Sequence, residues 1–554
     1  METRRLVLVL TGIAVVLIVV IGGLSLALLA GGEDSGGSGG GNQQPDGSPL
    51  PERLEGELRL FGPDPITLDP ACAADAGSAE YIVEIFSGLV SFDRDLKLVP
   101  DVASSWDVSD DGKTYTFHLR PNVLFHDRSR RVTAGDFKFS MERSLDPDTQ
   151  STVGDVYLDD IAGAREFADG KADEVSGIKV IDEDTLELDI SQPSSVFVEK
   201  LSYPTAYVVD RNEVKGSTCF EGGNWTLKPN GTGPFRLKEW VLGQRLELEP
   251  NSQYYLDPKP ALSRVTYVLS GGSPLVMYEN DEIDITGVGI NDIESVRDPN
   301  NPLNKEYSET PSLDVFYIGF NAQQAPFDDP KVRQALNMAV DRDFLANDLL
   351  AELVLPANGV LPPGMPGYNE GLDGLPFDPD RARQLLDEAG GPEILTDVKL
   401  LASGQGASPS QVLEAVVAMW QDNLGVTVTV EQEDFGLFLR DIDQGTFQIF
   451  SLGWVADYPD PQNFLDIKFH SQSGNNETKY ASSRVDSLLD QARTEKDEQK
   501  RLDLYRQAEE TIVQDSPWIP LYHGKASVLT KPYVKGYFIP PFVINNLRYV
   551  SITE

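Results

Sequence analysis

An uninterrupted apolar segment near the N-terminus, residues 6–30, limits the topology of this chain more than any other feature. It holds about 25 residues without a charge, enough for a helix that crosses a bilayer. Arg4 and Arg5 precede it, and basic residues mark the cytoplasmic side. The pattern predicts a cytoplasmic stub over 1–5, a single-pass cell-membrane anchor over 6–30 and an extracytoplasmic folded part. The alternative is a cleaved signal peptide with a secreted or periplasmic product, since Ala30 and Gly31 form a weak cleavage pattern.

A Gly/Ser-rich segment, residues 31–55, follows the apolar stretch. Such a composition cannot bury apolar surface, so it predicts a flexible linker between the anchor and the folded part. The whole chain has 554 residues, 40% of them hydrophobic. Because this length exceeds what one hydrophobic core usually supports, we expect two or three lobes.

The chain is strongly acidic, with a formal net charge of -42. Phosphate backbones are bound by clusters of Lys and Arg, so this balance argues against a nucleic-acid partner. It also disfavours direct contact with anionic lipid headgroups. The simplest interpretation is a solvated surface that keeps an exported protein soluble.

Strand-like and helix-like patterns alternate after the linker, which favours a mixed α/β fold. The strand predictions include 57–61, 114–119, 185–190, 245–249 and 426–430. Helices are predicted over 330–348, 380–389 and 498–514, where apolar residues recur at helical spacing.

Patterns that would indicate an enzyme or a metal site are absent from the sequence. The four His residues do not form a His-x-x-x-His pair, and neither the G-x-S-x-G nor the G-x-x-x-x-G-K-[ST] motif occurs. We therefore expect no catalytic residues, no metal and no cofactor. Cys72 and Cys219 are the only cysteines and both lie in loop-like sequence. A disulfide between them and two buried free thiols are both compatible with export.

Residues 453–464, GWVADYPDPQNF, are the strongest candidate for a ligand site. They follow an apolar run, and such a strand-to-loop edge can line a cleft. Asp457 has the chemistry to bind a ligand ammonium, and Trp454 and Tyr458 offer flat surfaces to its side chains. The alternative is a structural turn, in which the Asp caps local amides and the Trp packs in the core.

Several segments together resemble the peptide and nickel binding family (family 5) of ABC-importer solute-binding proteins, which includes oligopeptide- and dipeptide-binding proteins. The resemblance is carried by residues 100–143 (PDVASSWDVSDDGKTYTFHLRPNVLFHDRSRRVTAGDFKFSMER), 231–240 (GTGPFRLKEW), 316–345 (FYIGFNAQQAPFDDPKVRQALNMAVDRDFL) and 359–368 (GVLPPGMPGY). It covers nearly everything after the linker, and the segments occur in the family's order.

The resemblance implies an α/β, two-lobed, periplasmic-binding-protein-like clamp (type II, cluster C) with a small domain inserted in the first lobe. The expected boundaries are 56–90, 178–312 and 519–554 for the first lobe, 91–177 for the inserted domain and 313–518 for the second lobe.

The resemblance also assigns residues to the site. Asp457 is expected to hold the α-amino group of a bound peptide, which favours the ligand interpretation of its loop, and Trp454 falls at the matching aromatic position. The early segment Thr67, Leu68 and Asp69, followed by Pro70, resembles a cleft-lining segment. Tyr203 and residues 231–235 are expected to approach the hinge.

The chain departs from the family pattern in three places. A basic residue often accepts the ligand carboxylate, and here only Arg440, Lys468 and Arg484 are candidates, by proximity in sequence. The family's His-Asp-Gly appears as His126-Asp127-Arg128, and the lipid-attachment Cys of many relatives is missing. The segment 6–30 would replace that lipid.

The function implied is that of a monomeric, non-enzymatic binding component, which captures a di- or oligopeptide between its lobes and delivers it to ABC permease subunits. The same fold with a metal chelate, an oligosaccharide or an opine-like solute is the alternative within the binding class. An extracellular peptidase and a subunit that senses ligand for a membrane receptor are the alternatives from other classes.

Overall fold

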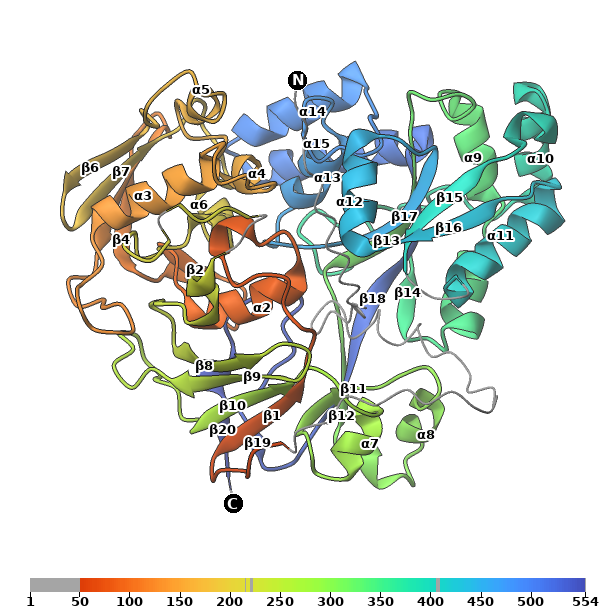
Figure 1. The fold of residues 1–554 in the computed structure, drawn as a ribbon. Coiled ribbons are helices and arrows are strands. Elements are labelled where there is room, and N and C mark those ends of the chain that lie inside the picture. Colours follow the sequence, from red (N-terminus) through yellow and green to blue (C-terminus); the bar gives the residue numbers. More distant parts are fainter. Residues whose placement is uncertain (1–49, 215, 220–222, 405–408, 554) are drawn as a thin grey trace, which may run out of the picture.

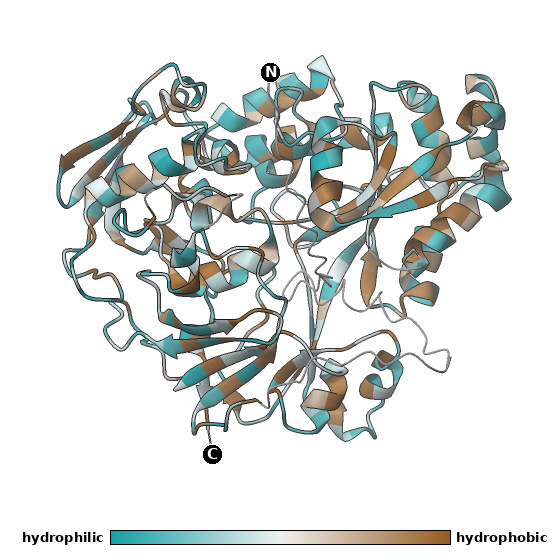
Figure 2. Cartoon of the chain, in the orientation of Figure 1, coloured by the Kyte–Doolittle hydropathy of each residue, from teal (hydrophilic) through white to brown (hydrophobic). Residues whose placement is uncertain are grey.

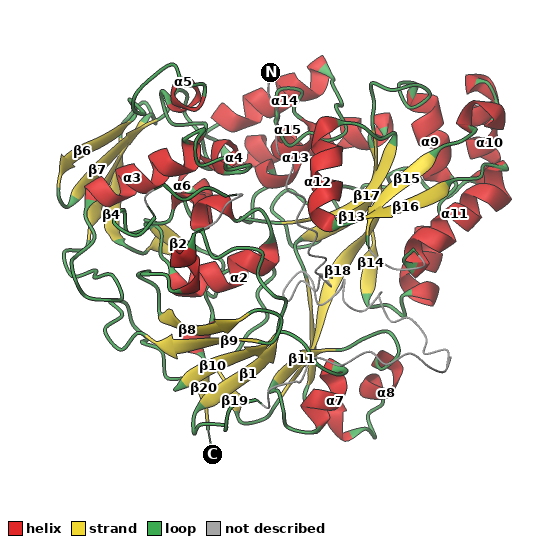
Figure 3. Cartoon of the chain, viewed as in Figure 1, coloured by secondary structure: helices red, strands yellow, loops and turns green. Residues whose placement is uncertain are grey.

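The computed structural model describes residues 50–214, 216–219, 223–404 and 409–553. Its elements form a two-lobed α/β fold in which the strands gather in two groups (Figures 1 and 3). Among the described residues no helix has the length and apolarity to cross a membrane. The expected anchor over 6–30 lies outside the described residues.

The first lobe is built on strands β1, β8, β9, β10 and β11, which are neighbours in one sheet. Strand β1 pairs in parallel with β10, while β8, β9 and β10 are antiparallel. Alternating residues such as Leu246 and Leu248 are fully buried against helix α2 and the C-terminal segment. The strands are β1 (Glu57–Phe61), β8 (Phe235–Val241), β9 (Arg245–Pro250), β10 (Arg264–Val268) and β11 (Ile285–Gly287), with helices α2 (Ala76–Ile85), α7 (Pro274–Glu279) and α8 (Ile293–Arg297).

A separate four-stranded antiparallel sheet, ordered β4-β5-β7-β6, lies beside the first lobe (Figure 1). Helix α3 covers this sheet. The N-terminus of α3 is capped by a capping box, in which the side chains of Thr133 and Asp136 each form a hydrogen bond with the backbone of the other residue. The elements are β4 (Ala103–Val108), β5 (Thr114–Leu119), β6 (Ile178–Asp182), β7 (Thr185–Asp189), α3 (Ala134–Leu145), α4 (Gly154–Leu158), α5 (Ala164–Ala168) and α6 (Phe197–Lys200). Two small two-stranded sheets complete this side: β2 (Val90–Phe92) with β3 (Leu98–Pro100), and β19 (Val534–Lys535) with β20 (Ser551–Ile552).

The second lobe contains strands β13 to β17 and the long helices of the C-terminal half. In Figure 2 helices α10 and α11 carry both hydrophobic and hydrophilic residues, as amphipathic helices do. The elements are β13 (Asp314–Phe320), β14 (Val354–Pro356), β15 (Lys399–Ser403), β16 (Thr429–Glu433), β17 (Ile449–Val455), α9 (Pro330–Met338), α10 (Pro379–Ala389), α11 (Gln411–Leu424), α12 (Phe435–Gln444), α13 (Gln462–Phe469), α14 (Ser483–Thr494) and α15 (Glu498–Asp515). The one-turn helices include η1 (Pro70–Cys72) and η2 (Pro204–Ala206).

Two chain segments cross between the lobes and pair with each other. Strand β18 (Trp518–Thr530) pairs with β13 at one end and with β12 (Tyr307–Pro311) and β11 at the other. It therefore joins both groups of strands into one 12-stranded sheet (Figure 3). The crossing lies where residues 311–314 face residues 522–525, and there the Gly524 N–H donates to the Asp314 carboxylate.

The local predictions agree with the structure except at two elements. The strand predictions near β1, β5, β7 and β9 and the helices α10 and α15 are confirmed. The strand expected at 426–430 is β16, displaced to Thr429–Glu433. The helix expected over 330–348 is wrong in its length, because α9 ends at Met338 and a π-helical segment, η5 (Phe344–Leu349), follows. Asp341 accepts a hydrogen bond from the Phe344 N–H and so starts that second segment.

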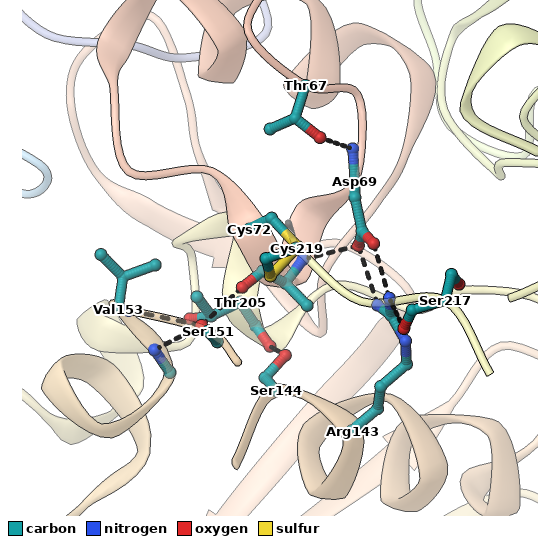
Figure 4. Close-up of a disulfide and its surroundings, with 12 residues drawn as sticks. Thr67, Asp69, Cys72, Arg143, Ser144, Ser151, Val153, Thr205, Ser217 and Cys219 are labelled. Atoms are coloured by element: carbon teal, nitrogen blue, oxygen red, sulfur yellow. Dashed lines mark hydrogen bonds and ion pairs between the residues drawn. A yellow bond between two sulfur atoms is a disulfide. The ribbon is translucent and has the colours of Figure 1, made fainter. Parts of the chain in front are cut away.

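The two cysteines form a disulfide, which decides between the alternatives left by the sequence. Cys72, at the end of η1, is bonded to Cys219 across a sequence separation of 147 residues (Figure 4). The bond fastens the segment before α2 to the loop that follows η2.

Candidate functional site

The candidate site lies where strand β17 ends and turns into helix α13. Ala456, just after the strand, donates its N–H to the Leu313 carbonyl at the lobe crossing. A turn closed by the Asp460 N–H on the Tyr458 carbonyl follows, and α13 begins at Gln462. The loop is therefore held between the crossing segment and the first turn of α13.

The Asp457 carboxylate accepts hydrogen bonds from α4, beside the first lobe, and from α13 of the second lobe. Its Oδ2 accepts one from the Tyr157 hydroxyl at 2.7 Å and one from the Asn463 amide nitrogen at 2.9 Å. Although the residue as a whole is half-buried, desolvation of its carboxyl group raises the pKa to about 6, against the hydrogen bonds and the charge of Lys468, which lower it. A carboxylate in such surroundings is stabilised by an arriving cation.

Two tyrosines extend this contact into the first lobe. The rings of Tyr157, on α4, and Tyr203, before η2, are stacked with centroids 3.8 Å apart and planes 8° apart. Tyr203 donates its hydroxyl to the Ala73 carbonyl at 2.8 Å, close to the N-terminus of α2. The sequence predicts Tyr203 but not Tyr157, because the short helix of Tyr157 carries no recognisable motif and its partner lies 300 residues away in sequence.

Trp454 is half-buried and held on two sides. Its indole N–H points at Asn463, 3.1 Å from the carbonyl oxygen and 3.2 Å from the side-chain oxygen. The Lys468 ammonium lies 3.7 Å from the ring centroid and 2.6 Å from the Glu477 carboxylate. Lys468 is 2% exposed, and Glu477 is the partner of its charge within the fold.

The other candidates for a ligand carboxylate lie elsewhere. Arg440 is exposed and pairs with its neighbour Asp441 at 2.7 Å. Arg484 is exposed near the start of α14. The structure thus brings Lys468 to the site and leaves the two arginines on the surface, and none of the three roles is tested by these contacts.

Tyr458 is fully buried, and its hydroxyl donates to the Gln462 side chain. This contact closes the turn before α13. A direct role of Tyr458 in binding stays a prediction.

The early segment is fastened internally (Figure 4). Asp69 is 3% exposed and binds the Arg143 guanidinium through both oxygens, at 2.8 and 2.5 Å. Thr67 accepts the Asp69 N–H at 3.0 Å, and Leu68 is fully buried. These contacts show that Asp69 holds Arg143 within the fold. The predicted ligand roles of Thr67, Leu68 and Asp69 stay predictions.

No group of three or more potential metal ligands occurs among the described residues. The contacts around Asp457 bring together a carboxylate, stacked aromatic rings and a partnered lysine. Such a set suits an organic ligand that carries an ammonium group.

The sequence of this chain is similar to those of known proteins. Residues 97–476 match the model of the family "Bacterial extracellular solute-binding proteins, family 5 Middle". The periplasmic oligopeptide-binding protein OppA of Escherichia coli is 32% identical over 497 residues, covering 87% of this chain and 89% of that protein. The dipeptide-binding protein of Escherichia coli is 27% identical, with 90% and 93% covered.

A solved structure has the same fold. The murein tripeptide binding protein MppA of Escherichia coli superposes with a TM-score of 0.80 at 28% sequence identity. The match covers 91% of this chain and 99% of that one.

Proposed function

The chain belongs to family 5 of the bacterial extracellular solute-binding proteins, and on that premise we propose that it captures peptides outside the cell membrane for an ABC importer. The ligand is held between the two lobes and passed to the permease. Relatives named for oligopeptides, dipeptides and a murein tripeptide support the peptide as substrate class.

The observation that carries the proposal is the position of Asp457 between the lobes. Both of its internal hydrogen bonds reach Oδ2 and come from neutral donors. We assign Oδ1 to the α-ammonium of the peptide, which would form a charge-assisted bond there. Every unmodified peptide carries this group, so the contact accepts many sequences.

Closure follows from contacts made by both lobes at once. A ligand that touches Asp457 in the second lobe and the stacked pair of Tyr157 in the inserted domain and Tyr203 in the first lobe binds best when the lobes are together. Binding therefore shifts the population toward the closed form, which the permease recognises. No covalent chemistry is needed for this cycle.

The test is calorimetry with trialanine and with N-acetyl-trialanine. Asp457→Ala should weaken trialanine binding at least tenfold, and acetylation of the peptide should have a similar effect on the unchanged protein. Asp380→Ala, which removes an exposed carboxylate on α10, is the matched control and should leave affinity unchanged. If trialanine binds equally well with and without its ammonium, Asp457 does not have this role.

Several finer features form part of the same proposal. The segment 6–30 anchors the chain in the cell membrane, and the alternative is a cleaved signal peptide. Residues 91–177 form a small domain inserted in a first lobe made of 56–90, 178–312 and 519–554, with 313–518 as the second lobe. The four-stranded sheet, separate from the 12-stranded one, supports an inserted domain, although only β4 and β5 lie within 91–177 and β6 and β7 follow directly at residues 178–189. The chain works as a monomer and catalyses no reaction.

A further inference from the structure

Asn463, the second residue of α13, contacts both functional side chains of the site. It is fully buried. Its Oδ1 accepts the Asp457 backbone N–H at 3.1 Å and the Trp454 indole N–H at 3.2 Å. Its Nδ2 donates to the Asp457 carboxylate at 2.9 Å.

The orientation of this amide is fixed by its partners. Two N–H donors face one end of the amide, so that end must be the oxygen, and the nitrogen then faces the carboxylate. Asp457 and Trp454 are thereby held at a fixed distance from each other through a single side chain. A buried amide with these partners is costly to rotate, because a flip would set N–H against N–H and oxygen against oxygen.

Within the described residues, the Asp457 carboxylate has few charged neighbours, and the dipole of the Asn463 amide faces it. The titratable groups that face the carboxylate are Tyr157 on α4, Tyr203 before η2, Tyr458 in its own loop and Lys468 on α13. Lys468 is itself neutralised by Glu477. The Asn463 amide supplies a neutral donor directly at Oδ2 of Asp457. A carboxylate in its place would repel the Asp457 carboxylate.

We propose that Asn463 is a positioning residue for ligand recognition: it orients the Asp457 carboxylate and the Trp454 indole toward the same ligand. The inference rests on the proposed function. Asn463 acts on the ligand only through its contacts with these two residues. It therefore affects both the orientation of the two side chains and the ionisation of Asp457.

The decisive variant is Asn463→Asp, which keeps the size and the accepting oxygen and replaces the donor with a second acid. Two carboxyl groups at hydrogen-bond distance share a proton, so Asp457 would ionise at higher pH. Trialanine binding is measured by calorimetry from pH 5 to pH 8. We expect at least tenfold weaker binding at pH 7 and an acid limb of the affinity profile that moves to higher pH.

Asn337→Asp is the matched control, since Asn337 is also buried, at 1% exposure, and lies on α9 away from the site. Its acid limb should coincide with that of the unchanged protein. If Asn463→Asp does not fold, Asn463→Ser removes the amide contacts without adding charge and should weaken binding at least fivefold at every pH.

The outcomes separate the two proposals. Suppose that the unchanged protein binds trialanine, and that each Asn463 variant that folds binds it with the same affinity and the same pH dependence as the unchanged protein. The positioning role is then overturned and the proposed function stands. If the unchanged protein binds neither trialanine nor longer peptides, the proposed function itself fails.

Discussion

At the scale of single residues, two of the buried charges near the predicted site are already paired within the fold. Asp69 binds Arg143, and Lys468 binds Glu477. A buried pair of this kind contributes little net stability, yet removing one partner leaves an uncompensated charge in the interior. The two acids predicted for the site thus differ: Asp457 is bonded to neutral donors and Asp69 to a cation.

Asp69→Ala should therefore act on stability. It leaves the Arg143 guanidinium, 7% exposed, without its carboxylate, and we expect the free energy of unfolding to fall by about 3–5 kcal/mol. Urea unfolding measures this change. The double variant Asp69→Leu with Arg143→Met should recover most of the loss. If Asp69→Ala weakens ligand binding at unchanged stability, the residue belongs to the ligand site instead.

At the scale of elements, the crossing between the lobes depends on close backbone approach. A Cβ added at Gly524 on β18 would lie 2.6 Å and 2.9 Å from the Asp314 carboxylate oxygens. Asp314 is fully buried, and desolvation raises its pKa to about 7. The Asp314 carboxyl group is closely packed on all sides, so it cannot move away from a new methyl group without displacing its neighbours.

Gly524→Ala should lower the free energy of unfolding by about 1–3 kcal/mol, because the new methyl group displaces the Asp314 carboxyl and strains the crossing. Gly474→Ala is the control, since a Cβ there meets nothing within 4 Å, and it should change stability by less than about 0.5 kcal/mol. Denaturant unfolding compares the two. Equal stabilities would show that the crossing adapts freely.

At the scale of the whole molecule, an acid lies partly buried between the lobes. Glu199, on α6 of the first lobe, faces the Asp460–Arg501 ion pair of the second lobe. Its Oε2 is buried and lacks a hydrogen-bond partner within the described structure, and desolvation raises the pKa to about 8. A group whose pKa is raised in the closed form takes up a proton on closure.

Glu199→Gln should therefore favour closure in a pH-dependent way. In the open form the carboxyl ionises near its ordinary value, so the closed form of the unchanged protein loses stability as pH rises from about 4.5 toward about 8. The variant should bind trialanine at least threefold tighter at pH 8, and this gain should shrink toward pH 5. Calorimetry at several pH values measures it, with the exposed Glu174→Gln as control. A gain that is constant with pH would contradict this linkage.

The sequence alone determined what depends on local order. Apolar spacing located β1, β5 and α10, and the order of motifs along the chain identified the family, while the ligand role of the Asp457 loop stays a prediction. These features are readable because a strand, a helix or a capped turn is set by residues close together in sequence. Even there, the helix predicted over 330–348 divided at Asp341, where a side-chain cap outweighed helical spacing.

Only the tertiary structure decided which distant residues meet. Tyr157 reaches Asp457 across 300 residues, Cys72 reaches Cys219 across 147, and β18 joins the two lobes by pairing with strands of both. Such contacts depend on the path of the whole chain and on which surfaces exclude water together, and no local pattern encodes them. Lys468, a candidate ligand partner in the sequence, is paired inside the fold with Glu477, nine residues further along the chain.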